Sequence, residues 1–172
     1  MLRRGTEQVV AGAIDARSSR GELQKRGPDM IGNGRFPIEL DRSPHPEDVD
    51  RVRAGLMAFN EFAVGPSKIV RLALYVREPD RTIRGGLVGF LAWQWLSIDL
   101  LWVDQPLRGQ GYGTALLAQA EQAARDAGCI AARLDTYEFQ ARPFYERNGY
   151  SVYGELAGYP AGTRTYLLKK SL

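Results

Sequence analysis

A glycine-rich loop offers the clearest chemistry in this sequence. Residues 108–113 read Arg-Gly-Gln-Gly-Tyr-Gly, and they separate an apolar segment from an alanine-rich segment with helical spacing. The free amide N–H groups in the first turn of a helix, together with the helix dipole, attract anions. Glycine lets the backbone approach a phosphate closely, and Arg108 adds a positive charge. The loop therefore predicts a phosphate site, with an ordinary glycine-rich helix cap as the alternative.

Two familiar nucleotide-binding loops fail to match this spacing. A Rossmann site requires Gly-x-Gly-x-x-Gly directly after the first strand, whereas this loop reads Gly-x-Gly-x-Gly and lies beyond the middle of the chain. A P-loop ends in Gly-Lys-Ser or Gly-Lys-Thr, whereas Gly113 is followed directly by Thr114. Both assignments fail on spacing.

A second motif, at residues 144–150, reads Phe-Tyr-Glu-Arg-Asn-Gly-Tyr and follows one predicted helix and one predicted strand after the loop. Two patterns resemble the signatures of the GCN5-related N-acetyltransferases (GNAT family). The first is the loop, Arg-x-x-Gly-x-Gly, and the second is the later Tyr followed by three residues, Gly and an aromatic. The resemblance covers about residues 36–169, and several segments look like a bacterial subgroup of general acetyltransferases. One position departs from the family pattern, because Glu138 stands where the family often has an asparagine, seven residues before Tyr145.

The resemblance implies a fold and a cofactor. It predicts an α/β (α+β) domain of the GNAT fold, in which a mixed, mostly antiparallel sheet of six to seven strands is flanked by helices on both faces. The implied cofactor is acetyl-CoA, used as a cosubstrate, with no metal. By position in the motifs, cofactor binding falls to Leu101, Trp102, Val103, Arg108, Gly109, Gln110, Gly111, Tyr112, Gly113, Thr114 and Phe144.

Acetyl transfer to an amine makes three chemical demands. The amine must lose a proton, since a lysine-like ammonium has a pKa of about 10.4. The tetrahedral intermediate carries an oxyanion that needs a backbone N–H donor, and the leaving thiolate of coenzyme A benefits from a proton. The resemblance assigns the oxyanion donor to the Val103 N–H and the general acid to Tyr145. Because no acyl-enzyme is needed, the predicted mechanism is direct attack in a ternary complex.

The general base is the least defined of the predicted groups. Asp99 is the first candidate, because two-residue alternation places it on the same strand face as Leu101 and Val103. Glu61, at the end of the first predicted helix, and Glu138 are alternatives, as are a water molecule and the absence of any single base. The predicted catalytic residues are therefore Tyr145 and Asp99.

The elements that must position these residues alternate along the chain. The predicted strands are 36–41, 69–76, 87–95, 98–103, 130–136, 150–156 and 164–169, and the predicted helices are 43–63, 111–127 and 140–147. The strand at 98–103 has apolar residues on both faces and is therefore expected to be central. The loop at 104–110 then joins a central strand to the second helix.

The composition agrees with one ordinary domain preceded by a tail. The chain has 172 residues, and its net charge of +3 includes +2 from residues 1–34, which hold few large apolar side chains. We expect residues 1–34 to be an N-terminal tail or linker, with a non-native origin left open, and residues 35–172 to be the N-acetyltransferase domain. An arm for RNA is a weaker alternative for the tail. The nearly neutral domain argues against nucleic acid.

Membrane and metal chemistry are also not expected. No apolar run approaches the roughly 20 residues of a membrane-spanning helix. The sequence has one cysteine and one histidine, so neither an internal disulfide nor a Cys- or His-rich metal site is expected. The predicted location is cytoplasmic. The expected partner is a small-molecule or peptide amine, with a homodimer as a candidate assembly. A non-catalytic module that binds an acyl-CoA for regulation is the alternative function, and Tyr145 beside an intact loop favours catalysis.

Overall fold

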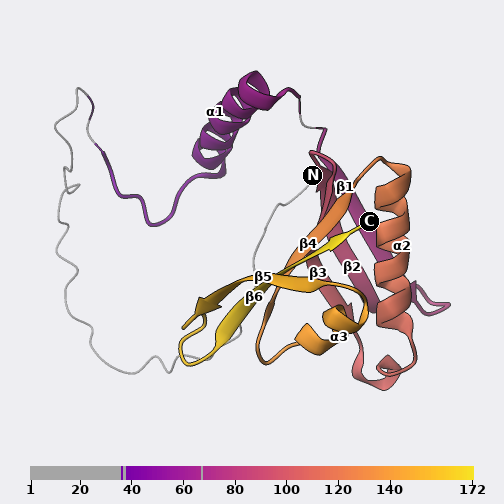
Figure 1. Ribbon diagram of the computed structural model, residues 1–172. Helices are drawn as coiled ribbons and strands as arrows, with labels where there is room; N and C mark the ends of the chain where they lie inside the picture. The colour runs from indigo at the N-terminus through magenta and orange to yellow at the C-terminus, as the bar shows by residue number, and fades with distance from the viewer. Residues whose placement is uncertain (1–35, 37, 67) are drawn as a thin grey trace. The chain divides into compact units, whose positions relative to one another are not determined.

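An open sheet of six strands is the centre of the fold (Figure 1). The computed structural model of the chain describes residues 36, 38–66 and 68–172. In chain order the elements are α1 (Pro46–Val64), β1 (Val70–Arg77), β2 (Ile83–Ala92), β3 (Trp95–Val103), the 3-10 helix η1 (Gln105–Leu107), α2 (Tyr112–Asp126), β4 (Ala131–Tyr137), α3 (Arg142–Arg147), β5 (Ser151–Ala157) and β6 (Arg164–Ser171). The strand order is β1-β2-β3-β4-β6-β5, and every neighbouring pair is antiparallel except β3 and β4. The predicted mixed, mostly antiparallel sheet is confirmed.

The first predicted strand, at 36–41, is wrong. Of the residues that the structure describes there, none is in a strand. The Asp41 carboxylate accepts a hydrogen bond from the Ser43 N–H at 2.8 Å, so the chain turns just before α1. A segment with alternating apolar residues forms a strand only where a neighbouring strand supplies hydrogen bonds. Pro37 also has no backbone N–H to donate to such a neighbour. The predicted tail, residues 1–34, lies outside the described residues.

The hairpin between β2 and β3 differs from prediction at its turn. The expected strand 87–95 ends instead at Ala92, and Trp93 and Gln94 form a two-residue turn with φ of 46° and 64°. Such turns require positive φ at both positions, and they favour Asn and Gly. The turn was missed because a tryptophan and a glutamine occupy those positions.

The hydrophobic core lies between one face of the sheet and α2, within the unit that spans residues 53–172. Leu87, Leu96, Leu117 and Leu168 are almost completely buried. Burial of each such side chain contributes about 2 kcal/mol to the free energy of unfolding. The residues of α2 that enter the core repeat at helical spacing, as the sequence predicted: Leu116, Leu117, Ala120 and Ala124. Aromatic residues of α3 and the turn after it enter the same core, so both helices hold this face.

The parallel strands β3 and β4 separate part-way along their length. Their pairing covers only Trp95–Ile98 against Ala131–Leu134, whereas β3 continues beside β2 to Val103 and β4 continues beside β6 to Tyr137. A β-bulge lies where the separation begins, because Ile98 pairs with Gly89, Leu100 pairs with Val88, and Asp99 is the extra residue. A Cβ at Gly89 would lie 2.2 Å from the Ser97 carbonyl oxygen, so this close approach requires glycine. The gap between β3 and β4 therefore begins beside Asp99.

Candidate active site

The glycine loop leaves backbone donors exposed at the start of α2. Gly109 and Gly111 have φ of 76° and 86°, which glycine adopts without strain. Gly111 caps α2 without a side-chain hydrogen bond, and the Ala115 N–H donates to its carbonyl oxygen at 2.9 Å. The amides of residues 112–114 precede that bond and have no acceptor within the helix. A Cβ at Gly109 or Gly111 would meet no described atom within 4 Å, so the space in front of these amides is open.

Hydrogen bonds fix the loop to the end of β3. The Asp104 carboxylate accepts from the Gln105 N–H at 2.7 Å, and its second oxygen lies 2.9 Å from the Arg84 guanidinium. The Arg108 Nε donates to the Val103 carbonyl oxygen at 2.9 Å. The guanidinium of Arg108 is thereby held between strand and helix, where its charge adds to the positive end of the α2 dipole.

The Val103 N–H points away from β2, toward the gap between β3 and β4. The Asp104 N–H donates to the Arg84 carbonyl oxygen at 2.8 Å, so these two residues form a hydrogen-bonded antiparallel pair. Hydrogen-bonded and non-hydrogen-bonded pairs alternate, and the next pair is Val103 with Gly85. The N–H of Val103 therefore faces the other side of β3. Since β4 pairs with β3 only as far as Ile98, the β3–β4 ladder places no acceptor opposite this N–H.

Tyr145 on α3 lies in an aromatic cluster close to the loop. Its side chain is buried and makes edge contacts with Phe144 and Tyr150, at centroid distances of 5.1 Å and 5.9 Å. The Phe144 ring in turn lies where a Cβ on Gly113 would approach within 3.4 Å, so α3 packs against the first turn of α2. Burial, with a smaller contribution from the negative charge of Asp135, raises the pKa of Tyr145 to about 12. The phenol is therefore protonated at neutral pH.

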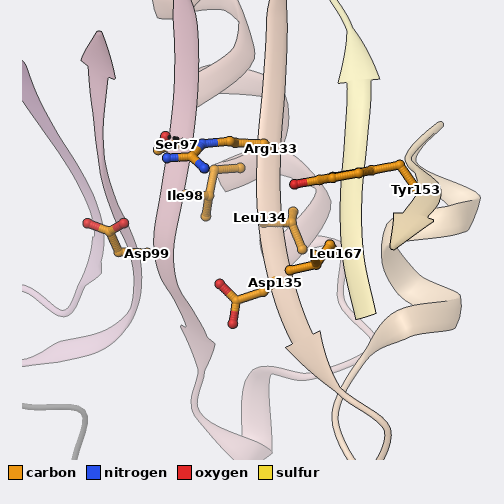
Figure 2. A pocket seen from close by; sticks show the side chains of 8 residues that line it. All are labelled: Ser97, Ile98, Asp99, Arg133, Leu134, Asp135, Tyr153 and Leu167. Carbon is orange, nitrogen blue, oxygen red and sulfur yellow. Dashed lines mark hydrogen bonds between the residues drawn. The ribbon is translucent and has the colours of Figure 1, made fainter. Parts of the chain in front are cut away.

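A pocket of about 110 Å³ opens where β3 and β4 separate (Figure 2). Its polar lining comes from β3, β4 and β5: Ser97, Asp99, Arg133, Asp135 and Tyr153. Its apolar lining is Ile98, Leu134 and Leu167. Figure 2 shows Arg133 reaching from β4 to Ser97 on β3, and Asp135 projecting from β4 toward β3. The negative charge of Asp135 also contributes to the raised pKa of Tyr145.

Loss of hydration raises the pKa of Asp99 above its ordinary value. The positive charges of Arg133 and Arg71 oppose this rise, and the negative charge of Asp135 adds to it. A carboxylate whose pKa is raised by surrounding protein, at the edge of a pocket, is a more effective proton acceptor than a fully hydrated one.

The family model of the acetyltransferase (GNAT) family matches residues 38–150. The chain belongs to this family. It is 48% identical, over 101 residues, to a blasticidin-S acetyltransferase of Streptomyces morookaense, a match that covers 58% of this chain and 74% of the relative. It is 39% identical, over 119 residues, to an acetyltransferase of Agrobacterium fabrum, covering 69% of this chain and 87% of that one.

A solved structure supports the same conclusion for the fold. The crystal structure of an Agrobacterium tumefaciens protein, assigned as an acetyltransferase, is 35% identical and superposes with a TM-score of 0.76. The match covers 80% of this chain and all of that one. The predicted family and the GNAT fold are therefore confirmed, and the chain is an acyltransferase.

In this GNAT chain, Asp99 lies on a different side of β3 from the one that alternation predicted. Leu101 and Val103 pack against the core beneath α2, whereas Asp99 lines the pocket with Ser97 and Arg133. The prediction of a shared face was wrong because the bulge inserts one residue and reverses the alternation beyond it. Asp99 as general base stays a prediction, now with a place in the pocket.

The structure brings most of the predicted site residues of this GNAT chain to one end of the sheet. The loop residues 108–114, the end of β3 and α3 meet around the gap, as described above. Glu138 is not part of the pocket lining. Its backbone N–H donates to the Arg164 carbonyl oxygen, and its carboxylate accepts a hydrogen bond from the Thr163 hydroxyl at 3.5 Å. Glu61 is an exposed residue of α1.

Sequence reasoning missed the residues that give the pocket its charge. Arg133 and Asp135 lie two residues apart on β4, on the face opposite the buried Ala132 and Leu134. Their alternation within a predicted strand was the available signal, since polar residues at every second position mark the face away from the core. Nothing in the sequence placed that face beside Asp99.

Neither a metal site nor a membrane-spanning helix occurs in the part of the chain that the structure describes. No group of three or more His, Cys, Asp or Glu side chains is arranged to hold a metal ion among residues 36, 38–66 and 68–172. Over the same residues, no helix combines the length and the hydropathy needed to cross a membrane.

Proposed function

We propose that this protein transfers the acetyl group of acetyl-CoA to a primary amine, by direct attack within a ternary complex. The observation that carries the proposal is the outward-facing Val103 N–H, which has no acceptor in the β3–β4 ladder. Three groups support the proposed chemistry. They are the exposed amides at the start of α2, the outward-facing Val103 N–H and the Tyr145 phenol. These groups answer three needs of thioester aminolysis, namely anion binding, carbonyl polarisation and stabilisation of the leaving sulfur.

The loop is suited to the pyrophosphate of acetyl-CoA. The amides of residues 112–114 and the fixed guanidinium of Arg108 supply donors and positive charge, and the glycines keep the approach open. The rest of the cosubstrate would then run along the last residues of β3, between Leu101 and Val103, and past Phe144. In that position the thioester carbonyl accepts a hydrogen bond from the Val103 N–H, which also stabilises the oxyanion.

Tyr145 acts on the sulfur as a hydrogen-bond donor. Its pKa of about 12 exceeds that of an ordinary thiol, about 8.5, so complete proton transfer to a thiolate is unfavourable. A hydrogen bond to the sulfur still stabilises the negative charge that develops as the C–S bond breaks. The Tyr145 phenol therefore orients and stabilises the leaving group, and the thiolate takes its final proton from solvent.

Asp99 serves the amine. A free ammonium is a much weaker acid than a carboxylic acid, so Asp99 does not deprotonate it, and the nucleophile is the neutral amine that forms when the ammonium gives one proton to solvent. The nitrogen becomes acidic as the N–C bond forms, and Asp99 accepts its proton at that stage, directly or through water. In sum, an N–C bond forms and the C–S bond breaks. The nitrogen loses one proton to solvent before attack and a second to Asp99 during attack, and coenzyme A leaves as a thiolate that takes a proton from solvent.

The acceptor we propose is a small-molecule amine. The relative in Streptomyces morookaense is named for blasticidin S, a small molecule, and it is 48% identical to this chain. The pocket of about 110 Å³ is well below the roughly 300 Å³ of a typical site for a drug-sized ligand. It therefore suits the amine-bearing end of an acceptor rather than a whole large molecule.

A thiol-release assay tests the proposed function. The protein is incubated with acetyl-CoA and a panel of amines that includes blasticidin S, and free coenzyme A is measured. We expect turnover with at least one amine, and we expect Tyr145→Phe to lower kcat at least tenfold with little change in acetyl-CoA affinity. Acetyl-CoA binding without thiol release on any amine would contradict the proposal and favour a regulatory binding module.

A further inference from the structure

Three charged side chains line the pocket without forming a close ion pair in the part of the chain that the structure describes. They are Asp99, Arg133 and Asp135. All three residues are exposed, so water solvates their charges when no ligand is bound. A set of unpaired charges of both signs is therefore available to a ligand.

Arg133 is held in place by a neutral group. Its Nε donates to the Ser97 hydroxyl at 2.9 Å, and Ser97 is buried on β3. This bond spans the two strands just where they separate, and it uses one of the five N–H donors of the guanidinium. The charge of Arg133 is thus oriented without being neutralised, and its terminal nitrogens can bind a planar anion in a two-pronged manner.

The two carboxylates lie where the strands have parted. Asp99 is the bulged residue of β3, and Asp135 lies one position beyond Leu134, the last β4 residue that pairs with β3. Both are exposed, so a cation can reach them. Loss of hydration is the main cause of the raised pKa of Asp99, and the negative charge of Asp135 adds a smaller part, which a positively charged group bound nearby would offset.

We propose that the acceptor of this acetyltransferase is an aminocarboxylate, a small molecule with an amine and a carboxylate. The carboxylate binds the Arg133 guanidinium that Ser97 orients, and the amine lies in the gap beside Asp135, with Asp99 at the β3 edge of the same pocket. This proposal rests on the proposed function, because it names the substrate class of the same site. Arg71 on β1 and Lys169 on β6 also carry positive charge toward this region, since Arg71 acts on Asp99 and Lys169 lies over the Tyr153 ring. An acceptor with cationic groups alone would meet these charges unfavourably.

Matched acceptors test this proposal. Glycine, β-alanine, 4-aminobutyrate and 6-aminohexanoate are each compared with the corresponding amino amide, which keeps the amine and removes the negative charge. Two quantities are measured for every pair: kcat/KM from thiol release, and affinity for the protein saturated with coenzyme A by calorimetry. We expect at least one acid to exceed its amide at least tenfold in affinity, and in kcat/KM where turnover occurs.

Variants identify the residue responsible for the preference. Arg133→Gln should remove the preference by lowering the affinity for the acid at least tenfold, with little effect on the amide. Arg133→Lys keeps the positive charge but loses the planar guanidinium, so its affinity for the acid should lie between those of the parent protein and Arg133→Gln. Arg125→Gln is the control, because Arg125 is an exposed residue of α2 whose side chain donates hydrogen bonds only to Gln122 among the described residues. Unchanged thermal unfolding confirms that each variant is folded.

The outcomes separate the two proposals. Equal binding of acid and amide, a preference that survives Arg133→Gln, or no binding of any acid overturns the aminocarboxylate assignment, whatever the assay of acetyl transfer shows. Selective binding of an acid without thiol release supports the assignment and overturns the proposed transfer. Selective binding with turnover supports both.

Discussion

At the scale of single residues, the site depends on groups whose ordinary chemistry is altered by a neighbour. Arg108 keeps its charge while the Val103 carbonyl fixes its direction. Tyr145 is a very weak acid because it is buried, which suits hydrogen bonding to a sulfur better than proton release. Gly109 and Gly111 contribute by the absence of a side chain in front of the α2 amides.

Gly111→Ala tests the role of the glycine in anion binding. A Cβ at this left-handed position strains the backbone by about 1 kcal/mol and stands in the approach to the helix amides. We expect the dissociation constant of acetyl-CoA, measured by calorimetry, to rise at least tenfold. The matched control is Gly128→Ala at the other end of α2, where φ is 81° and a Cβ likewise meets no described atom within 4 Å. Equal affinity in the two variants would argue against the pyrophosphate assignment.

At the scale of elements, two irregularities in β3 create the site. The bulge at Asp99 turns that carboxylate toward the pocket, and the early end of β3–β4 pairing frees the outward N–H of Val103. Both depend on a firm support on the other side of the sheet, which α2 provides by packing on β1, β2 and β3. The helix also connects to β6, because the buried Glu121 accepts a hydrogen bond from Lys170 Nζ at 2.6 Å.

Lys170→Met tests how much the α2–β6 ion pair contributes to stability. The substitution leaves the Glu121 carboxylate buried without its cation, and the cost of such a group is about 3 kcal/mol. Urea unfolding should therefore show a loss of that size in the free energy of unfolding. The double variant Glu121→Leu, Lys170→Met removes both charges and should regain most of the loss. A double variant as unstable as Lys170→Met alone would show that the unpaired carboxylate is not the cause.

At the scale of the whole molecule, periodicity and motifs predicted most of the sheet, and tertiary contacts decided the rest. The buried face of α2 and the strands after residue 68 were predictable from local patterns. Buried residues recur with the helical period in α2 and at every second position in the strands. The strand at 36–41 failed because a strand depends on a partner that its own residues do not encode. The pocket charges of Arg133 and Asp135 were missed for the same reason, because their meaning arises from a bulge and a separation between strands distant in sequence.

The buried tyrosines also predict how the whole domain responds to alkali. Burial raises the pKa of Tyr145 to about 12 and raises the pKa of Tyr150 as well, with Glu121 adding to the second effect. An unfolded chain has tyrosine pKa values of about 10. Above that pH the unfolded state releases protons that the folded state keeps, so the stability contributed by these phenols is complete below pH 10 and is lost as the pH rises toward 12.

For Tyr145 alone, this linkage predicts a loss of about 1.4 kcal/mol in the free energy of unfolding between pH 8 and pH 11. Tyr145→Phe should flatten the pH dependence by that amount, because phenylalanine has no proton to release from the unfolded chain. Urea unfolding at a series of pH values measures the difference. Tyr75→Phe removes a hydroxyl from an exposed ring and should keep the slope of the parent protein. A parallel pH dependence for Tyr145→Phe and the parent would mean that the phenol ionises as easily in the folded site as in water. Proton transfer from a phenol with a pKa of about 10 to a thiolate would then be less unfavourable, and the raised pKa would no longer argue for a hydrogen-bond donor over a general acid.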